Sequence, residues 1–566
     1  MLHHDNRSRH AVGHLAEFYS CPTESNSGSD DGRTLAMDEQ GDLEENFELN
    51  DFSGSHNGST YLGSTFDSEF EDSSSDEEVR SPSFLRSRKA SASTLQSFML
   101  YTPDEERSVI RKFDRRLVLF VALLYMLSFL DRSNIVNARI AGLSEDLHLS
   151  SLQYEWLLRV SYVTYILFEW MTLLWKVIPP HIYLSTCVAS WGLNASTQSV
   201  ASSFISLLVL RAALGIGEAA FVGVPFFMSF FYKRDELAFR TGLFISAAPL
   251  ATAFASSFAW VITKIGNRIP IADWRLLFLV EGFPSIIVSV FVFLYIPDNP
   301  ETAKYLTRRE QKVAKLRLCK ETSGKGAGTG GLMWSEIRKT LIDPKIYFTA
   351  PMFFFSNVAF SSWPTFLPII IKEMGYSALT SQVLSAPPYL ASFFSVLLTA
   401  YLSDRYRTRS TFVIFHALLA SSGYAMMASA GSVEASAKWR YVGVYPAATG
   451  FFSVVTIVIT WTINNQDSDS KKGTGVAMLK YIGQLGPLVG VHLYPDSDQP
   501  YYINMKGMAI CACSMATVAI LAYSPRRILD TKNRRMATED SKAVGEDESL
   551  VQNRTDQERK QFMLML

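Results

Sequence analysis

Residues 117–135 carry the stretch that decides the fold class, LVLFVALLYMLSFLDRSNI. A helix needs about 20 mostly apolar residues to cross the hydrocarbon core of a bilayer. The run from Leu117 to Leu130 supplies most of such a segment, and charged residues follow it at once. The same pattern, a long apolar run bounded by polar or charged residues, recurs along the chain. It predicts two groups of six transmembrane helices, near 115–136, 156–176, 182–201, 204–231, 241–263 and 274–296, and near 346–371, 382–402, 411–430, 440–463, 474–494 and 503–524.

Composition agrees with a membrane protein that carries one very different terminal segment. The chain has 566 residues, of which 48% are hydrophobic and 19% charged, against about 25% charged in an average soluble protein. Residues 1–100 contain 19 acidic and 7 basic residues. Such a segment cannot bury enough apolar surface to offset its chain entropy. We therefore predict an all-α integral membrane protein with a disordered acidic N-terminal tail.

Charge also indicates topology and partners. Eleven Lys and Arg residues lie between the two groups of helices, in 297–345, and cytoplasmic loops carry such an excess. The remaining positive charge is scattered between apolar runs, so no nucleic-acid partner is expected. We predict five regions: a cytoplasmic tail over 1–112, a six-helix bundle over 113–297, a cytoplasmic central loop over 298–345, a second six-helix bundle over 346–524 and a cytoplasmic tail over 525–566.

The N-terminal tail offers candidate regulatory sites. Ser91 follows Arg88-Lys89-Ala90, a pattern typical of basophilic kinases, and the serines of 73–75 precede acidic residues, as acidophilic kinases prefer. Kinases are therefore possible partners of the tail. We expect the plasma membrane, although a vacuolar membrane would obey the same topology rules.

Two charges in the fourth segment are candidates for the transport chemistry. A lone ionised side chain near the bilayer centre costs about 2.5–3.5 kcal/mol, and such residues mostly face a cavity or a partner. Arg211 and Glu218 stand seven residues apart, two turns along nearly the same helix face. Gly215 and Gly217 between them would let a neighbouring helix approach closely. We expect Arg211 to attract an anion and Glu218 to exchange a proton; the alternative is a structural pair.

Other polar residues are candidates for the same site. Arg132 and Asn134 end the first segment, and a guanidinium fork suits a carboxylate or sulfonate; Arg132 could instead pair with Asp131 at the interface. Glu169 is a second candidate for proton coupling, or else caps a helix contact. Asn357 is a candidate for substrate binding, or else a satisfied buried amide.

A possible gate lies at the predicted cytoplasmic end of the eighth segment. There Asp404 and Arg405 stand in the run Leu402-Ser403-Asp404-Arg405, with further arginines after it. A carboxylate at a helix end beside arginines can latch two helices together. The alternative is ordinary enrichment of positive charge on the cytoplasmic side.

These motifs resemble the major facilitator superfamily. Within it the chain is similar to the fungal allantoate-permease group of anion:cation symporters, including pantothenate and nicotinate transporters. The likeness spans about 105–525. It rests on Leu130–Ile135 (LDRSNI), the Arg211–Glu218 helix followed by Ser229–Arg234 (SFFYKR), Trp274–Gly282 and the loop at Leu402–Arg405.

The resemblance implies two six-helix bundles around a central cavity and alternating access. It further implies proton-coupled uptake of a small organic anion, either a carboxylate such as a vitamin or allantoate, or a sulfonate. In related anion transporters the residues matching Arg211 and Glu218 bind the anion and carry protons, and an arginine at the place of Arg132 is also implicated. No cofactor beyond the coupling proton and no enzymatic activity are expected. The alternative is a non-transporting nutrient sensor with the same fold.

Three departures from the family pattern leave the transport capacity open. Val136 stands where members commonly have glycine, and Trp170-Met171-Thr172 replaces the usual proline-serine-asparagine. The stretch 220–224 lacks a proline and is one residue shorter. A residue lost from a helix rotates all that follows by about 100°.

Overall fold

The structure is a computed structural model that describes residues 101–266, 270–322, 333–360, 378–429, 435–466, 468–493 and 506–546, together with 367 and 371. The acidic tail over 1–100, with Ser91 and the serines of 73–75, lies outside the described residues. So do the glycine-rich stretch 323–331 and the last residues of the chain.

The N-terminal half is a series of helices, and the described part of the chain contains no strand. It comprises α3 (Pro103–Phe113), η1 (Asp114–Val118), α4 (Leu119–Ile140), α5 (Leu143–Asp146), α6 (Ser151–Phe168), η2 (Glu169–Lys176), α7 (Pro180–Thr197), η3 (Gln198–Val200), α8 (Phe204–Ala219), η4 (Ala220–Gly223), α9 (Val224–Met228), α10 (Leu237–Gly266) and α11 (Asp273–Tyr295). Side-chain caps begin several of these helices: Thr102 and Glu105 form a capping box at α3, and Ser150 and Gln153 form another at α6.

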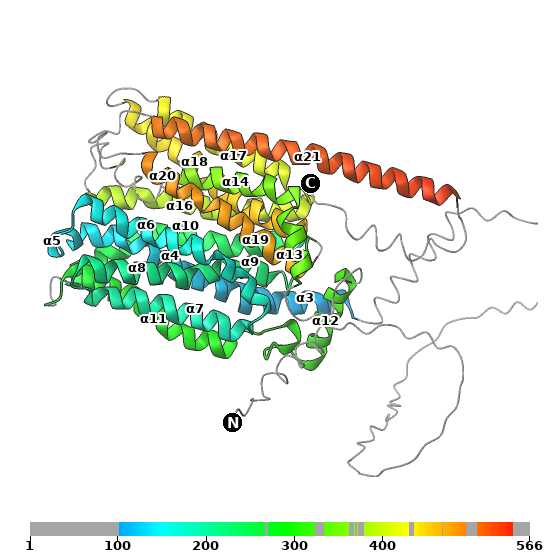
Figure 1. Cartoon of the computed structure of the whole chain (residues 1–566), viewed down its shortest axis with the longest axis horizontal. Coiled ribbons are helices and arrows are strands. Elements are labelled where there is room, and N and C mark those ends of the chain that lie inside the picture. The colour runs from blue at the N-terminus through cyan, green and yellow to red at the C-terminus, as the bar shows by residue number, and fades with distance from the viewer. Residues whose placement is uncertain are drawn as a thin grey trace, which may run out of the picture. The chain divides into compact units, whose positions relative to one another are not determined.

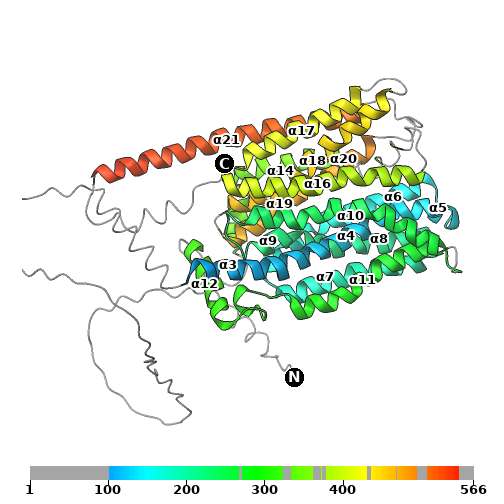
Figure 2. The same ribbon diagram turned by 180° about the vertical axis from the view of Figure 1, so that it is seen from behind.

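Three short helices connect the halves: η5 (Pro300–Thr302), α12 (Arg308–Thr322) and α13 (Trp334–Leu341). The C-terminal half comprises α14 (Pro344–Phe360), α16 (Ala378–Tyr406), α17 (Ser410–Ser429), α18 (Ala435–Asn464), α19 (Asp469–Gly483), α20 (Leu485–Gly490), η6 (Val491–Leu493) and α21 (Lys506–Glu546). Both views of the ribbon show α7 beside α11, and α3 beside α12 near one end of the long helices (Figures 1 and 2).

The predicted segments coincide with described helices or runs of consecutive helices, except that the seventh, 346–371, is described as α14 only as far as Phe360, and most of 361–371 lies outside the described residues. Seven described spans are long and apolar enough to cross a membrane: Ser151–Lys176, Phe204–Met228, Leu237–Ala255, Asp273–Tyr295, Ser410–Ser429, Lys438–Asn464 and Lys506–Ser524. Helices suit this setting because every backbone polar group must be satisfied within the segment. The predicted all-helical membrane fold is confirmed.

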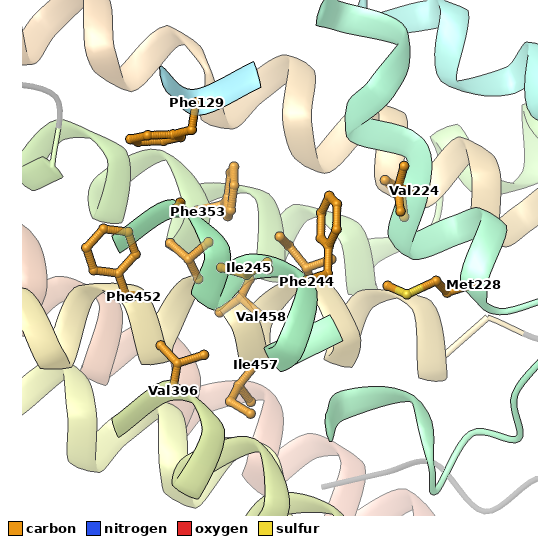
Figure 3. Packing of buried hydrophobic residues seen from close by; sticks show 14 of the residues in the cluster. Phe129, Val224, Met228, Phe244, Ile245, Phe353, Val396, Phe452, Ile457 and Val458 are labelled. Atoms are coloured by element: carbon orange, nitrogen blue, oxygen red, sulfur yellow. The ribbon is translucent and has the colours of Figure 1, made fainter. Parts of the chain in front are cut away.

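The two halves share one hydrophobic core. Its buried residues include Phe129 of α4 and Phe244 of α10 from the first half, and Phe353 of α14 and Phe452 of α18 from the second. Figure 3 shows part of this cluster, where side chains from both halves gather. The contacts between halves run mainly along α10 with α16 and α18, and along η2 with α19.

The helix that begins with α6 ends in 3-10 geometry at η2, and the helix that begins with α8 changes to 3-10 geometry at η4 before it continues as α9. The two segments touch, because Trp175 Nε1 donates a hydrogen bond of 2.9 Å to the carbonyl of Ala220. A 3-10 stretch inside a helix frequently marks a hinge or a functional site.

Candidate functional site

A buried ion pair joins α4 and α8, which correspond to the first and fourth of the twelve predicted segments. Arg132 of α4 donates from Nε and Nη2 to Oε2 of Glu218 on α8, at 2.8 and 2.6 Å. The Glu218 side chain is 3% exposed and that of Arg132 30%. The guanidinium also lies 4.9 Å from the ring centroid of Tyr165. Oε1 of Glu218 is buried without a partner among the described residues.

The glycines of the fourth span hold this pair close to its neighbours. A Cβ at Gly215 would collide with Thr164 and the carbonyl of Ser161 on α6, and one at Gly217 would press on α7. The hydroxyl of Ser161 donates to the carbonyl of Arg211 across the same contact, at 3.1 Å. The predicted close approach at Gly215 and Gly217 is therefore confirmed.

Arg211 is buried but takes no part in the ion pair. It is 2% exposed, and its Nε and Nη2 have no hydrogen-bond partner in the described chain. Its guanidinium lies 5.7 Å from the ring of Phe278, within electrostatic range of Glu218 and Asp131. Glu218 pairs with Arg132 of a neighbouring helix and not with Arg211, so the alternative of a structural role through neighbouring residues stays open beside the predicted transport role.

Two further carboxylates lie in the same interior. Asp131 accepts a hydrogen bond of 3.0 Å from the hydroxyl of Ser285 on α11 through one oxygen. Its other oxygen, and both oxygens of Glu281, are buried without partners among the described residues. The interior of the first half thus contains both cations, Arg132 and Arg211, and carboxylates, among them Asp131 and Glu281.

Glu169 lies where the two halves meet. It opens η2, its side chain is fully buried, and neither oxygen has a hydrogen-bond partner among the described residues. The cations that act on it electrostatically are Lys480 of α19, with the larger effect, and Arg132. Lys480 is 7% exposed, with its ammonium 4.4 Å from the ring centroid of Phe353.

The two predicted amide ligands make contacts between helices. Asn134 donates to the carbonyl of Leu277 on α11 at 3.4 Å, and Asn357 donates to the carbonyl of Gly483 on α19 at 3.3 Å. Both side chains are buried. For Asn357 this geometry favours the alternative of a satisfied buried amide, whereas Oδ1 of Asn134 is buried without a partner among the described residues. The role of both in binding substrate stays a prediction.

The predicted gate at Asp404 is a contact between the halves. One carboxylate oxygen accepts from the backbone N–H of Phe239 in the first turn of α10, and the other accepts from Nη2 of Arg409, each at 2.7 Å. A carboxylate at a helix N-terminus is favoured by the helix dipole. The guanidinium partner is Arg409, whereas Arg405 is exposed and has no described partner.

Further hydrogen bonds close the same end of the molecule, the predicted cytoplasmic face. Arg407 pairs with Asp235 at 3.1 Å, Lys176 donates to the hydroxyl of Ser470 at 3.1 Å, and Arg234 donates to the carbonyl of Gln466 at 3.1 Å. At the opposite end, the described contact between polar side chains of the two halves joins Arg159 and His492 at 3.4 Å.

A second ionic cluster lies at the predicted cytoplasmic face of the first half. Arg317 of α12 is fully buried and pairs with Glu106 of α3 at 3.2 Å and with Glu236. Lys233 also donates to Glu106 at 2.5 Å. Although burial alone raises it, the neighbouring Lys233 and Arg317 hold the pKa of Glu106 below its ordinary value. We call Arg317, Glu106, Glu236 and Lys233 the clamp.

Sequence reasoning missed two parts of this arrangement. The first is a role for Lys480, whose position inside the eleventh predicted segment was the available signal. The second is the clamp, because residues 298–345 are predicted as a cytoplasmic loop. In the structure part of this loop is α12, which begins at Arg308 and buries Val313, Ala314 and Arg317.

Comparison with known proteins assigns the fold to a family. The sequence model of the Major Facilitator Superfamily matches residues 121–491. A transporter of Schizosaccharomyces pombe is 32% identical over 421 residues, which cover 74% of this chain and 86% of that protein. The high-affinity nicotinic acid transporter of Saccharomyces cerevisiae is 28% identical over 435 residues, covering 75% and 80%.

Solved structures agree on the architecture. The proton:xylose symporter XylE superposes with a TM-score of 0.56 at 12% identity, covering 72% of this chain and 95% of that one. The predicted family and fold are confirmed, and the relatives are transporters. The chain therefore belongs to the Major Facilitator Superfamily and is a multi-pass membrane transporter of a small solute.

Proposed function

We propose that the protein couples the import of a small organic anion to protons by alternating access. The observation that carries the proposal is the buried pair in which Arg132 donates twice to one oxygen of Glu218. The other oxygen is buried without a partner among the described residues. A carboxylate held in this way can take up a proton, and a guanidinium released from it can bind an anion.

The pair makes proton and anion binding depend on each other. A proton on Glu218 removes the negative charge that Arg132 neutralises, so its planar fork becomes free for a carboxylate or sulfonate. An anion on Arg132 without that proton would compete with Glu218. A proton alone would leave a buried cation unpaired, which is strongly unfavourable. The empty state and the state that holds both a proton and an anion are balanced in charge. These are the states that change between outward-facing and inward-facing forms.

Arg211 extends the cationic site. Its Nε and Nη2 have no described hydrogen-bond partner, and it lies within electrostatic range of Glu218. It can attract an anion before Glu218 is protonated. Glu169 is a second proton-coupling candidate, because its carboxylate is fully buried.

The substrate class follows from the chemistry of the cations together with the relatives. A fungal relative is a nicotinic acid transporter, which makes a pyridine carboxylate the first candidate here; allantoate, pantothenate, biotin and sulfonates follow. One proton per monoanion is electroneutral and uses only the pH gradient. Two pH units correspond to about 2.7 kcal/mol, or roughly 100-fold accumulation. A second proton would add about 2.3 kcal/mol per 100 mV.

We place the protein in the plasma membrane with both termini cytoplasmic. The eleven Lys and Arg residues of 297–345 support this orientation. The acidic tail then faces the cytoplasm, where kinases can reach Ser91 and the serines of 73–75.

The test is uptake in cells that lack their own anion permeases. Labelled nicotinate, pantothenate, biotin, allantoate and a sulfonate are each supplied at pH 5 and pH 7, with and without an uncoupler. We expect one of them to accumulate at pH 5 and to be lost when the uncoupler is added. Accumulation that ignores both pH and the uncoupler would contradict symport. No uptake by a protein shown to be at the surface would contradict transport of these anions.

A further inference from the structure

The interior of the second half contains a cation that the proposed mechanism has not used. Lys480 lies on α19, one of the helices that meet the first half along η2. Its side chain is buried, and the ammonium lies over the face of Phe353 at 4.4 Å from the ring centroid. Among the described residues it makes no hydrogen bond. Such a cation is held by an aromatic face and a nearby negative charge, not by a closed ion pair.

That negative charge is Glu169, on the opposite half of the molecule. The charged and titratable groups facing Glu169 come from four elements: Lys480 of α19, Arg132 of α4, Tyr165 of α6 and Tyr183 of α7. Although cations stand on two sides, both carboxylate oxygens lack a described hydrogen-bond partner. Arg132 instead directs its described hydrogen bonds to Glu218.

The contrast between the two carboxylates suggests different roles. A structural ion pair in a membrane interior needs close geometry to repay the cost of burying both charges. The Arg132–Glu218 pair meets that requirement at 2.6 Å. Glu169 and Lys480 do not meet it, although they are electrostatic partners. A carboxylate in loose association with a cation is suited to being exchanged for another carboxylate.

We propose that Lys480 is the anchor in the second half for the carboxylate of the substrate, and that Glu169 occupies this anchor when no substrate is bound. The inference rests on the proposed transport of an organic anion and adds a binding residue to it. The incoming carboxylate takes the place of Glu169 beside Lys480. Because Arg132 belongs to the first half and Lys480 to the second, one anion then contacts both halves. Binding of the substrate anion therefore changes the contacts between the two halves, which must rearrange during transport.

The experiment compares four variants in the same permease-deficient cells, with labelled nicotinate as the probe. Lys480→Met removes the charge and keeps the apolar stem, Lys480→Arg keeps the charge, and Glu169→Gln removes the internal anion. Lys472→Met is the matched control: it lies on the same helix, and its ammonium pairs with Asp469 of that helix at 3.1 Å. We expect Lys480→Met to raise the KM at least tenfold, Lys480→Arg to raise it less, and Lys472→Met to leave it unchanged.

The double variant Glu169→Gln/Lys480→Met separates binding from structure. If the pair only balanced its own charges, removing both would restore the wild-type KM and melting temperature. If Lys480 binds substrate, the KM of the double variant stays as high as that of Lys480→Met. Nicotinamide, which lacks the carboxylate, should not compete with nicotinate in the wild type.

The outcomes distinguish this inference from the proposed function. If the wild type takes up nicotinate, an unchanged KM in Lys480→Met would overturn the role of Lys480 alone. A return to the wild-type KM in the double variant would do the same. Absence of wild-type uptake of nicotinate, together with no shift in the melting temperature of the purified protein on adding nicotinate, would overturn both for this substrate. The same comparison is then run with whichever anion of the panel the wild type accumulates.

Discussion

Charges at the predicted cytoplasmic face and charges in the membrane interior are arranged in opposite ways. At the face, Asp404 receives two hydrogen bonds of 2.7 Å, and Arg317 is shared between two carboxylates. In the interior, oxygens of Glu169, Glu281 and Asp131 lack described partners although they are buried. The face, where water can compete, has closed pairs, whereas in the interior the closed Arg132–Glu218 pair stands beside carboxylate oxygens without described partners.

The difference between closed pairs at the face and unpartnered oxygens in the interior bears on the role of each region. An unpartnered polar atom is costly in a low-dielectric interior, so a purely structural interior would not retain several of them. Such atoms are useful where a proton or an anion must enter and leave. Closed pairs at a face hold two bodies together until the state of the interior changes. Under the proposed function, the interior residues therefore exchange the proton and the anion, and the residues at the face hold a conformation.

The largest effect is expected from Glu218→Gln. The amide keeps the shape but cannot exchange a proton, so uptake driven by a pH gradient should fall at least 100-fold. Exchange of labelled for unlabelled substrate across the membrane should persist, because it needs no net proton movement. Uptake and exchange are measured on the same preparation with surface expression matched. A variant that still accumulates substrate at pH 5 would move proton coupling to another carboxylate.

Arg211→Lys is expected to have the next largest effect. Lysine keeps the positive charge but loses the planar fork that suits a carboxylate, so the KM for the transported anion should rise about tenfold with little change in kcat. The control is Arg275→Lys. Arg275 lies in the first turn of α11, and its guanidinium carbon is 4.5 Å from the ring centroid of Trp274. Equal KM values for wild type and Arg211→Lys would place the anion site elsewhere.

The two regions also differ in how well sequence predicts them. The spans and the interior charges follow from hydropathy and from the cost of burial, so Arg132, Arg211 and Glu218 could be named in advance. Pairing depends on helix rotation and on contacts between helices, which is why Arg132 and not Arg211 holds Glu218. For the same reason Arg409, and not Arg405, holds Asp404.

The fourth span illustrates what sequence alone leaves open. The stretch 220–224 is one residue short of the pattern that the resemblance implies, which predicts a rotation of about 100° beyond it. In the structure, η4 spans Ala220–Gly223 in 3-10 geometry. Four residues turn by about 480° at 3.0 residues per turn, against about 400° in an α-helix. The tighter turn recovers roughly 80° of the rotation.

At the face, Asp404→Asn is expected to change conformation without abolishing transport. The amide keeps one acceptor for the N–H of Phe239 but loses the charge that pairs with Arg409, which weakens the contact between α16 and α10. We expect a several-fold increase in the labelling of a cysteine placed near this end of the helices. Arg405→Ala is the control, because Arg405 is exposed and has no described partner; equal labelling in both variants would contradict a gate at Asp404.

The clamp should affect stability and leave the KM unchanged. Arg317→Ala removes a fully buried guanidinium from between Glu106 and Glu236, and breaking a buried pair costs about 3–5 kcal/mol. Both carboxylates are partly exposed, so we expect about 2 kcal/mol and a lower melting temperature in detergent. Arg309→Ala is the control, since its pair with Glu105 is exposed and such pairs contribute at most about 1 kcal/mol. A matching loss in both variants would show that α12 is not held by Arg317.

The smallest effect is a pH dependence within the same clamp. Lys233 and Arg317 hold the pKa of Glu106 below its ordinary 4.5 against the opposing effect of burial. An acid with a lowered pKa in the folded state adds stability above its unfolded value, and that contribution disappears as the pH falls through the folded value. Wild type should therefore melt at a higher temperature than Glu106→Gln at pH 7, and the difference should shrink as the pH falls below 4.5 and vanish only below the lowered pKa of the folded state. Because the Glu106 side chain is 21% exposed, solvent screens its pairs in part, and the difference should correspond to about 1 kcal/mol or less. A difference that persists unchanged into acid would show that Glu106 acts by packing and not by its charge.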